Sequence, residues 1–308
     1  MWKSTRQKDI VVLGVDIGGT EIKFGVISGR EIIAKKQIDT LYKDDTEKLV
    51  DYIAKECQNL IDEYGVKAVG VGVPGNVVEN KVTSSNLPFR NTPLSKMLSE
   101  KLKMEVFVEN DANCAGYGEL VWCNEEKYKN IVMITIGTGI GGSIIIDNKI
   151  YRGMESAGEI GHMIIERDGR PCNCGLNGCF EQYASITALI RDAVEAAKNN
   201  PESFIFKVYE ENENKLDGKL FFKALQNNCE VAKKVFDKYT DYLSMGLVSL
   251  VNIFSPEAII VAGGITKEGD AFLNPIREKI KRDIPIKISK LQNDAGIVGA
   301  AMLGIYKA

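Results

Sequence analysis

Short runs of apolar, β-branched residues alternate along the chain with segments whose apolar residues recur at helical spacing. The first run covers residues 10–15, and two more strand-like runs follow at 22–27 and 31–35. Residues 46–64 then show helical periodicity and end at Gly65, a residue type common at helix ends. This pattern predicts three strands joined by tight turns and followed by a helix.

The same alternation continues through the rest of the chain. It predicts further strands at 66–73, 106–108, 131–136, 143–146, near 150, at 258–261 and at 286–288. It predicts helices at 92–103 with Thr92 as N-cap, from Ala112 onward, and at 183–198, 230–250, 271–281 and 295–306. Residues 202–228 are acidic and irregular, which leaves a helical insert and a mobile cover as alternatives. Strands that alternate with helices in this way indicate an α/β fold.

Glycine-rich turns follow two of the predicted strands. They read Asp16-Ile17-Gly18-Gly19-Thr20 and Gly137-Thr138-Gly139-Ile140-Gly141-Gly142, about 120 residues apart, and this self-similarity suggests two related halves. Glycine lets backbone N–H groups approach phosphate oxygens, and a threonine in each turn adds a hydroxyl donor. A third pair, Gly263-Gly264, follows another strand. Phosphate binding is therefore favoured over the alternative that these turns are plain hairpins.

The glycine turns differ from two well-known phosphate-binding motifs. Neither ends in the glycine-lysine-serine/threonine of a P-loop. Each leads into another strand, whereas the Rossmann fingerprint leads into a helix.

Composition limits the classes of partner. The 308 residues carry a formal net charge of −3 and 44% hydrophobic residues, so no basic surface for nucleic acid or an anionic membrane is indicated. The length suggests two domains or one large one. No apolar run approaches the roughly 20 residues of a bilayer span, and residues 1–16 show no signal-peptide pattern. We therefore expect a cytoplasmic protein without nucleic-acid or membrane partners.

A histidine and three cysteines lie close together in one stretch. His162 is the only histidine, and Cys172, Cys174 and Cys179 are three of the seven cysteines. One imidazole and three thiolates form the ligand set of a closed, structural zinc site with no position left for a substrate. The alternative is a core histidine near reduced cysteines. The zinc interpretation is favoured because clustered cysteines in a cytosolic protein are more often metal ligands than disulfides.

Three carboxylates near these motifs have two interpretations each. Glu159 and Glu181 flank the histidine and cysteine stretch, where they are either solvated acids or ligands for the hydroxyl groups of a polyol. Asp111 follows a predicted strand and opens a helix. It is therefore either an N-cap or a carboxylate at the sheet edge where α/β folds bind ligands. Asp16, in the first glycine turn, is a candidate ligand for hydrated Mg²⁺.

Taken in order along the chain, these motifs resemble the ROK family of sugar kinases. The resemblance implies an α/β fold of the actin-like ATPase (ribonuclease H-like) type, with two lobes around a cleft. The implied lobes are residues 1–115, with the helix 295–308 packed back on them, and residues 116–294, which contain the zinc loop. The resemblance rests on the two glycine turns, Pro74-Gly75, Asn86-Leu87-Pro88, Glu109-Asn110-Asp111, Gly158-Glu159-Ile160-Gly161-His162, the stretch 172–181 and Gly263-Gly264.

The resemblance also implies a role for each matching residue. Asp111 matches the catalytic base. Residues matching sugar-binding positions are Gly75, Asn86, Asn110, Asp111, Glu159, His162 and Glu181. Residues assigned to the nucleotide and its phosphates are Asp16, Gly18, Gly19, Thr20, Lys23, Gly137, Thr138, Gly139, Gly141, Gly263 and Gly264. The metal ligands are His162, Cys172, Cys174 and Cys179, so His162 would serve both zinc and sugar.

We therefore expect an ATP-dependent kinase that phosphorylates the 6-hydroxyl group of an aldohexose. ATP, Mg²⁺ and a structural Zn²⁺ are the implied cofactors, and a homodimer is the implied assembly. Asn86-Leu87-Pro88 is similar to the run in the family's allose kinases, whereas its glucokinases carry asparagine-leucine-glycine-tryptophan. Glucose or allose is favoured, with N-acetylmannosamine and fructose as alternatives.

The family also contains transcriptional repressors with an added N-terminal helix-turn-helix region. Only fifteen residues precede Asp16 here, and Asp111 is present, so a kinase is expected. A non-catalytic sugar sensor is the alternative from another functional class.

Overall fold

The structure is a computed structural model that describes residues 10–124, 126–154 and 157–306. Residues 1–9 of the segment examined for a signal peptide, and residues 307–308 of the expected last helix, lie outside the described residues. The described chain divides into two compact units. Unit 1 comprises the described residues of Met1–Met133, Gly142–Gly158 and Ser289–Ala308, and unit 2 comprises Ile134–Gly141 and Glu159–Ile288.

The core of unit 1 is built on a five-stranded mixed sheet in the order β3-β2-β1-β4-β7. The strands are β1 (Val11–Ile17), β2 (Glu21–Ser28), β3 (Glu31–Asp39), β4 (Ala68–Val73) and β7 (Val106–Asn110). The first three pair antiparallel as a meander, and β1, β4 and β7 are parallel. A small hairpin, β5 (Asn76–Val78) and β6 (Lys81–Thr83), follows β4.

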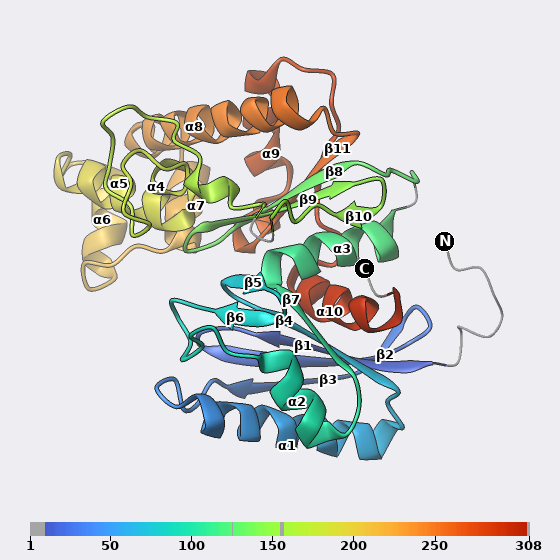
Figure 1. The fold of residues 1–308 in the computed structure, drawn as a ribbon. Coiled ribbons are helices and arrows are strands. Elements are labelled where there is room, and N and C mark those ends of the chain that lie inside the picture. Colours follow the sequence, from blue (N-terminus) through green and yellow to red (C-terminus); the bar gives the residue numbers. More distant parts are fainter. Residues whose placement is uncertain (1–9, 125, 155–156, 307–308) are drawn as a thin grey trace. The chain divides into compact units, whose positions relative to one another are not determined.

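Helices cover both faces of this first sheet. Helices α1 (Thr46–Tyr64) and α2 (Leu94–Leu102) pack on one face, and α10 (Ala295–Tyr306) packs on the other (Figure 1). Helix α3 (Asp111–Cys123) packs against α10. A Cβ atom on Gly14 or Gly70 would overlap backbone carbonyls of α10, so glycine at these positions lets the helix lie directly on β1 and β4.

A second five-stranded sheet has the order β10-β9-β8-β11-β12. Its strands are β8 (Ile131–Ile136), β9 (Ile140–Ile146), β10 (Lys149–Ile150), β11 (Ala258–Ala262) and β12 (Ile286–Ile288). The helices of unit 2 are α4 (Glu181–Ala184), α5 (Ile186–Lys198), α6 (Phe204–Glu211), α7 (Gly218–Gln226), α8 (Glu230–Phe254) and α9 (Asp270–Ile280). The short 3-10 helices are η1 (Ile160–His162), η2 (Gly264–Glu268) and η3 (Gln292–Asp294).

The α/β class and most predicted elements are confirmed. Helix α1 has the predicted bounds, and Gly65 ends it in the left-handed conformation with φ 67°. The acidic segment 202–228 contains helices α6 and α7, which agrees with the helical insert. Among the described helices, none is both long and apolar enough to cross a bilayer.

Two local predictions are wrong. The helix expected at 183–198 is interrupted, because the side chain of Ser185 accepts a hydrogen bond from Ala188 N and caps a separate helix, α5. Thr92 does not cap α2. It forms a β-bridge with Val82, and its hydroxyl accepts a hydrogen bond from Arg90 N.

Candidate functional site

The residues assigned to ATP and sugar fall into two groups, one in each unit. In unit 1, the parallel register aligns Asp16 of β1 with Gly72 of β4, and Gly72 with Glu109 of β7. The residues that follow these three positions therefore leave the sheet at one carboxyl edge. Because ligands bind at the carboxyl ends of strands in α/β folds, this edge is the candidate site of unit 1.

Asp111 stands at the start of a helix on this edge. Asn110 is the N-cap, since its Oδ1 accepts a hydrogen bond of 3.1 Å from Asn113 N. Asp111 is the first helical residue, and its Oδ1 accepts a hydrogen bond of 2.8 Å from Ala112 N. The N-cap interpretation of Asp111 is therefore wrong, and capping leaves its carboxylate available for another role.

Burial raises the pKa of both Asp16 and Asp111, and the charge of Asp111 also acts on Asp16. Burial is the main cause that raises the pKa of Asp111, and hydrogen bonds from Ala112 and Asn110 oppose it. Burial and then repulsion from Asp111 raise the pKa of Asp16 to about 6, while Lys23 lowers it. Lys23 lies opposite Asp16 in the β1–β2 register. A Cβ atom on Gly296 would lie 2.7 Å from Asp16 Oδ2, so this carboxylate also lies at the N-terminus of α10.

The loop that carries Asn86 lies against the first glycine turn. A Cβ atom on Gly19 would lie 3.7 Å from Asn86 Cβ. The carbonyl of Gly75 accepts a hydrogen bond of 3.0 Å from Asn110 Nδ2. Unit 1 thus brings Gly19, Gly75 and Asn86 to the edge that carries Asn110 and Asp111.

The side chain of Arg90 organises this loop, a role that sequence reasoning missed. Its Nη1 donates hydrogen bonds to the carbonyls of Ser84, Leu87 and Phe89. Phe89 is fully buried. The residues on either side of Asn86 are therefore fixed by one guanidinium group and a core anchor.

In unit 2 the four predicted metal ligands converge. One side-chain atom from each of His162, Cys172, Cys174 and Cys179 lies within 4.8 Å of the others. Cys172 Sγ lies 3.6 Å from His162 Nδ1, and Cys174 Sγ lies 3.5 Å from Cys179 Sγ. The chain turns back to achieve this, since Cys172 N donates to Leu176 O over 2.8 Å and Ile164 bridges Cys179.

This donor set fits a zinc ion. Tetrahedral coordination with zinc–sulfur bonds near 2.3 Å and zinc–nitrogen bonds near 2.0–2.1 Å requires about 3.6 Å between nitrogen and sulfur and about 3.8 Å between two sulfurs. The separations of 3.6 Å and 3.5 Å are close to these values. The imidazole nitrogen that faces the cluster is Nδ1, so Nε2 is the atom left for another partner.

Glu181 connects the cysteine cluster to the second glycine turn. Its Oε1 accepts a hydrogen bond of 3.2 Å from Cys172 Sγ. A Cβ atom on Gly139 would lie 2.7 Å from Glu181 Oε2. A Cβ atom on Gly263 would overlap the carbonyl oxygen of Ile136, so the third glycine pair also lies next to this turn. Unit 2 thus brings together the predicted metal ligands, Glu181 and two of the predicted phosphate loops.

Glu159 precedes the ligand His162 by three residues and is exposed. Its carbonyl accepts a hydrogen bond of 3.0 Å from His162 N across the short helix η1. The backbone therefore couples Glu159 to His162.

Comparison with known proteins identifies the class. The solved structures that the chain resembles include a ROK family glucokinase and a ROK hexokinase, and the chain has their actin-like ATPase fold. The chain belongs to the ROK family, whose model matches residues 12–306.

Three relatives illustrate the range of that family. A glucokinase of Streptomyces coelicolor is 36% identical over 95% of this chain and 97% of its own length. The crystal structure of a ROK family glucokinase from Streptomyces griseus in complex with glucose and AMPPNP is 34% identical, with a TM-score of 0.83, over 96% of this chain and 99% of that chain. A xylose repressor of Caldicellulosiruptor bescii is 28% identical over 96% of this chain and 78% of its own length.

Proposed function

We propose that the protein is an ATP-dependent hexose kinase that phosphorylates the 6-hydroxyl group of an aldohexose. The observation that carries the proposal is the position of Asp111, a half-buried carboxylate at a capped helix start on the carboxyl edge of the first sheet. Membership of the ROK family and similarity to glucokinases along nearly the whole chain support it.

Asp111 is the proposed general base. Burial raises the pKa of this carboxyl group, which makes the carboxylate a stronger proton acceptor than a solvated aspartate. It takes the proton from the 6-hydroxyl group as the oxygen attacks the terminal phosphorus of ATP. Phosphoryl transfer needs such a residue to orient and deprotonate the acceptor, with little other covalent chemistry from the protein.

The glycine turns and Asp16 form the proposed phosphate-binding parts. Gly18 N and Gly137 N close the two turns by donating to Glu21 O and Gly139 O. Backbone N–H groups of Gly19 and of Thr138-Gly139 donate to phosphate oxygens, as glycine-rich turns permit. The buried charge of Asp16 is only partly offset by Lys23, which fits a carboxylate that holds a divalent cation. Mg²⁺, when bound, neutralises phosphate charge there.

His162, Glu159 and Glu181 are proposed to hold the sugar hydroxyl groups, with Asn86 and Asn110 as further contacts. Zinc on the cysteine cluster supplies rigidity and no chemistry, since all four ligands come from the protein. The short distance of 3.2 Å between Cys172 Sγ and Glu181 Oε1 supports this view because it places a proposed sugar ligand directly beside the cluster.

The proposal is tested by coupled ADP release with a panel of hexoses. Wild-type protein should release ADP with glucose or allose, and N-acetylmannosamine and fructose complete the panel. Asp111→Asn should lower kcat by about 10²–10⁴-fold, the usual contribution of a general base, and should leave hexose binding nearly unchanged in calorimetry. Asp44→Asn, an exposed position before α1, is the matched control and should remain active. Near-normal turnover by Asp111→Asn would disprove the assignment.

A sugar-sensing regulator is the second candidate, because a xylose repressor is similar along nearly the whole chain. A regulator would bind hexose in calorimetry without releasing ADP in the same panel. We further propose a homodimer, which light scattering of the purified protein tests directly.

A further inference from the structure

Glu109 and Arg152 lie beside the proposed base, and no motif of the sequence assigned them a role. Glu109 is the last but one residue of β7 and is 6% exposed. Its Oε2 accepts an ion-paired hydrogen bond of 2.6 Å from Arg152 Nε. A carboxylate is buried at a cost that only charge pairing and hydrogen bonds offset, so this placement calls for an explanation.

The other oxygen of Glu109 connects the residues on both sides of Asp111. Oε1 accepts a hydrogen bond of 2.9 Å from Asn110 N and one of 3.1 Å from Asn113 Nδ2. Asn110 is the N-cap of α3, and Asn113 N donates to it. One carboxylate oxygen therefore fixes the residue before Asp111 and the residue two positions after it.

The ion pair aims this oxygen. Arg152 holds Oε2, and a carboxylate with one oxygen held by a planar guanidinium has little freedom to rotate. The ion pair with Arg152 therefore contributes to the position of the start of α3, in addition to the hydrogen bonds that Oε1 accepts. Burial raises the pKa of the nearby Cys114 thiol, the carboxylates of Glu109 and Asp111 raise it further, and Arg152 opposes them.

We infer that Glu109 and Arg152 are positioning residues that hold Asp111 in register for proton abstraction. This inference rests on the proposed kinase function. Asp111 touches the reacting hydroxyl in that proposal, whereas Glu109 and Arg152 act through the backbone and side chains of Asn110 and Asn113.

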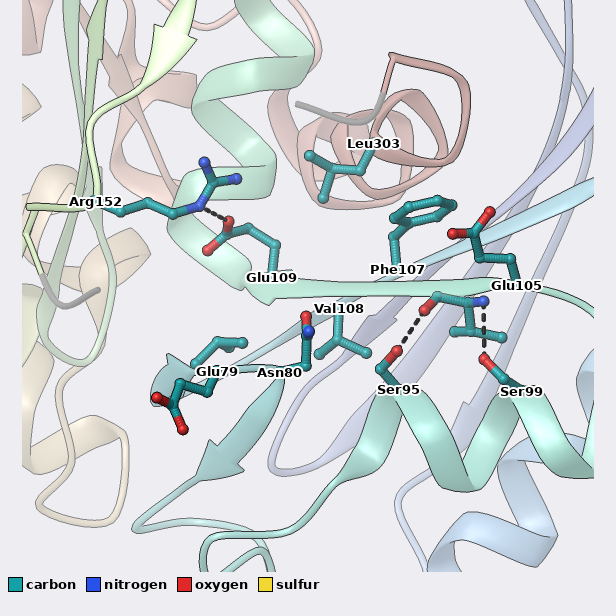
Figure 2. Close-up of a pocket in the computed structure, with 12 residues that line it drawn as sticks. Glu79, Asn80, Ser95, Ser99, Glu105, Phe107, Val108, Glu109, Arg152 and Leu303 are labelled. Atoms are coloured by element: carbon teal, nitrogen blue, oxygen red, sulfur yellow. Dashed lines mark hydrogen bonds and ion pairs between the residues drawn. The ribbon is translucent and has the colours of Figure 1, made fainter. Parts of the chain in front are cut away.

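Small solutes can reach the Glu109–Arg152 ion pair through a pocket. Glu109 and Arg152 form one end of a cavity of ≈ 410 Å³ that is also lined by Asn80, Phe107 and Leu303. Figure 2 shows the side chains of Glu109 and Phe107 on one side of β7, with the guanidinium of Arg152 directed at the Glu109 carboxylate. Shortening Arg152 therefore enlarges an existing cavity, and a small cation can reach the vacated place.

The first experiment measures steady-state kinetics of Arg152→Ala and Glu109→Gln. Each should lower kcat by about 10- to 100-fold, the usual effect of displacing a reacting group by about 1 Å, while the KM for ATP stays within about twofold. Guanidinium chloride at about 20 mM should restore at least about a third of the lost kcat of Arg152→Ala by replacing the missing charge-assisted hydrogen bond. Tetramethylammonium chloride, which cannot donate hydrogen bonds, should restore nothing.

Glu119→Gln is the matched control. Glu119 is a buried carboxylate on α3, and its Oε1 accepts hydrogen bonds from Ser289 Oγ (2.5 Å) and Leu291 N (2.7 Å). This variant should lower the thermal midpoint as much as Glu109→Gln while keeping kcat. The inference is wrong if Arg152→Ala keeps wild-type kcat, if guanidinium gives no recovery, or if the two glutamate variants lose kcat equally.

Amide hydrogen exchange separates this inference from the proposed function. Exchange of the peptide that spans Asn110 to Cys114 should accelerate by about tenfold in Arg152→Ala, because the hydrogen bonds that order it are weakened. Peptides of α1 should be unchanged. If wild-type protein released no ADP with any hexose, the kinase proposal would fail, and this exchange result would still decide whether the pair orders the start of α3. Unchanged exchange in that peptide would refute the inference.

Discussion

The carboxylate of Asp16 is less stable in the folded protein than in the unfolded chain. Burial and the charge of Asp111 raise its pKa from 3.8 to about 6. A group whose folded pKa is raised binds its proton more tightly in the folded state. Ionised Asp16 therefore destabilises the folded protein. This contribution lowers the free energy of unfolding progressively as pH rises from about 4 through about 6.

At pH 7.5, without Mg²⁺ or nucleotide, Asp16→Asn should increase the free energy of unfolding by about 3 kcal/mol, since one pKa unit corresponds to about 1.4 kcal/mol. The gain should fall to about 1 kcal/mol at pH 4.5, where Asp16 is protonated more often in both the folded and the unfolded protein. Urea unfolding at the two pH values measures it. An equal gain at both would show that the charge is not the cause. Activity should be lost at every pH, because Asp16 is the proposed cation ligand.

At the scale of elements, the loop between β6 and α2 shows how one side chain can supply the hydrogen bonds that a helix or strand would otherwise provide. Residues 84–90 form neither helix nor strand, yet Arg90 satisfies the carbonyls of Ser84, Leu87 and Phe89. The hydroxyl of Thr46 at the start of α1 donates to the carbonyl of Pro88. The loop that carries Asn86 is thus pre-formed, which lowers the ordering cost of binding a ligand.

Arg90→Leu should raise the KM for hexose by about tenfold, which corresponds to the loss of about 1.4 kcal/mol of preorganisation. The KM for ATP should change little, since Arg90 contacts only the 84–89 loop and Thr92 among the hydrogen bonds given above. Arg30→Leu in the exposed β2–β3 turn makes the same change of charge and should have no effect. An equal change in both KM values would indicate general disruption of unit 1.

At the scale of the whole molecule, each unit contains β-strands and is stabilised by different interactions. Unit 1 is stabilised by direct contact of α10 with β1 and β4. Unit 2 carries the histidine and cysteine cluster, and Tyr183 and Tyr242 form hydrogen bonds with Arg170 and Glu166 in the segment between His162 and Cys172. The ring centroids of the two tyrosines lie 4.6 Å apart, and the hydroxyl of Tyr242 donates to Glu166 Oε2 over 3.0 Å.

Purified protein should contain one zinc ion per chain, measured by inductively coupled plasma mass spectrometry. Cys174→Ala removes the exposed ligand of the cluster and should abolish zinc retention, raise the Kd for hexose by about tenfold, and accelerate hydrogen exchange in residues 163–181. Exchange in β1 and β4 should not change, because those strands belong to unit 1. Cys123→Ala is the control outside the cluster. Unaltered hexose affinity in zinc-free Cys174→Ala would refute the supporting role of the metal.

The sequence determined most of the secondary structure because the relevant signals are local. Apolar spacing over 46–64 and the glycine at 65 define α1 without help from other segments. The cluster of His162 with three cysteines was also foreseeable, since all four ligands lie within one short stretch and only a few metals accept that set. The break at Ser185 was missed because a serine cap competes with a helical pattern that is apolar on both sides.

Only the tertiary structure decided which charged groups act together. Glu109 and Arg152 are 43 residues apart, and Glu119 and Ser289 are 170 apart; a charge in the sequence does not reveal a partner at such a distance. The same holds for Asp16, whose raised pKa depends on burial and on Asp111. Periodicity and ligand type are properties of a segment, so sequence alone fixes them. Burial, charge pairing and pKa depend on what the fold places next to a residue.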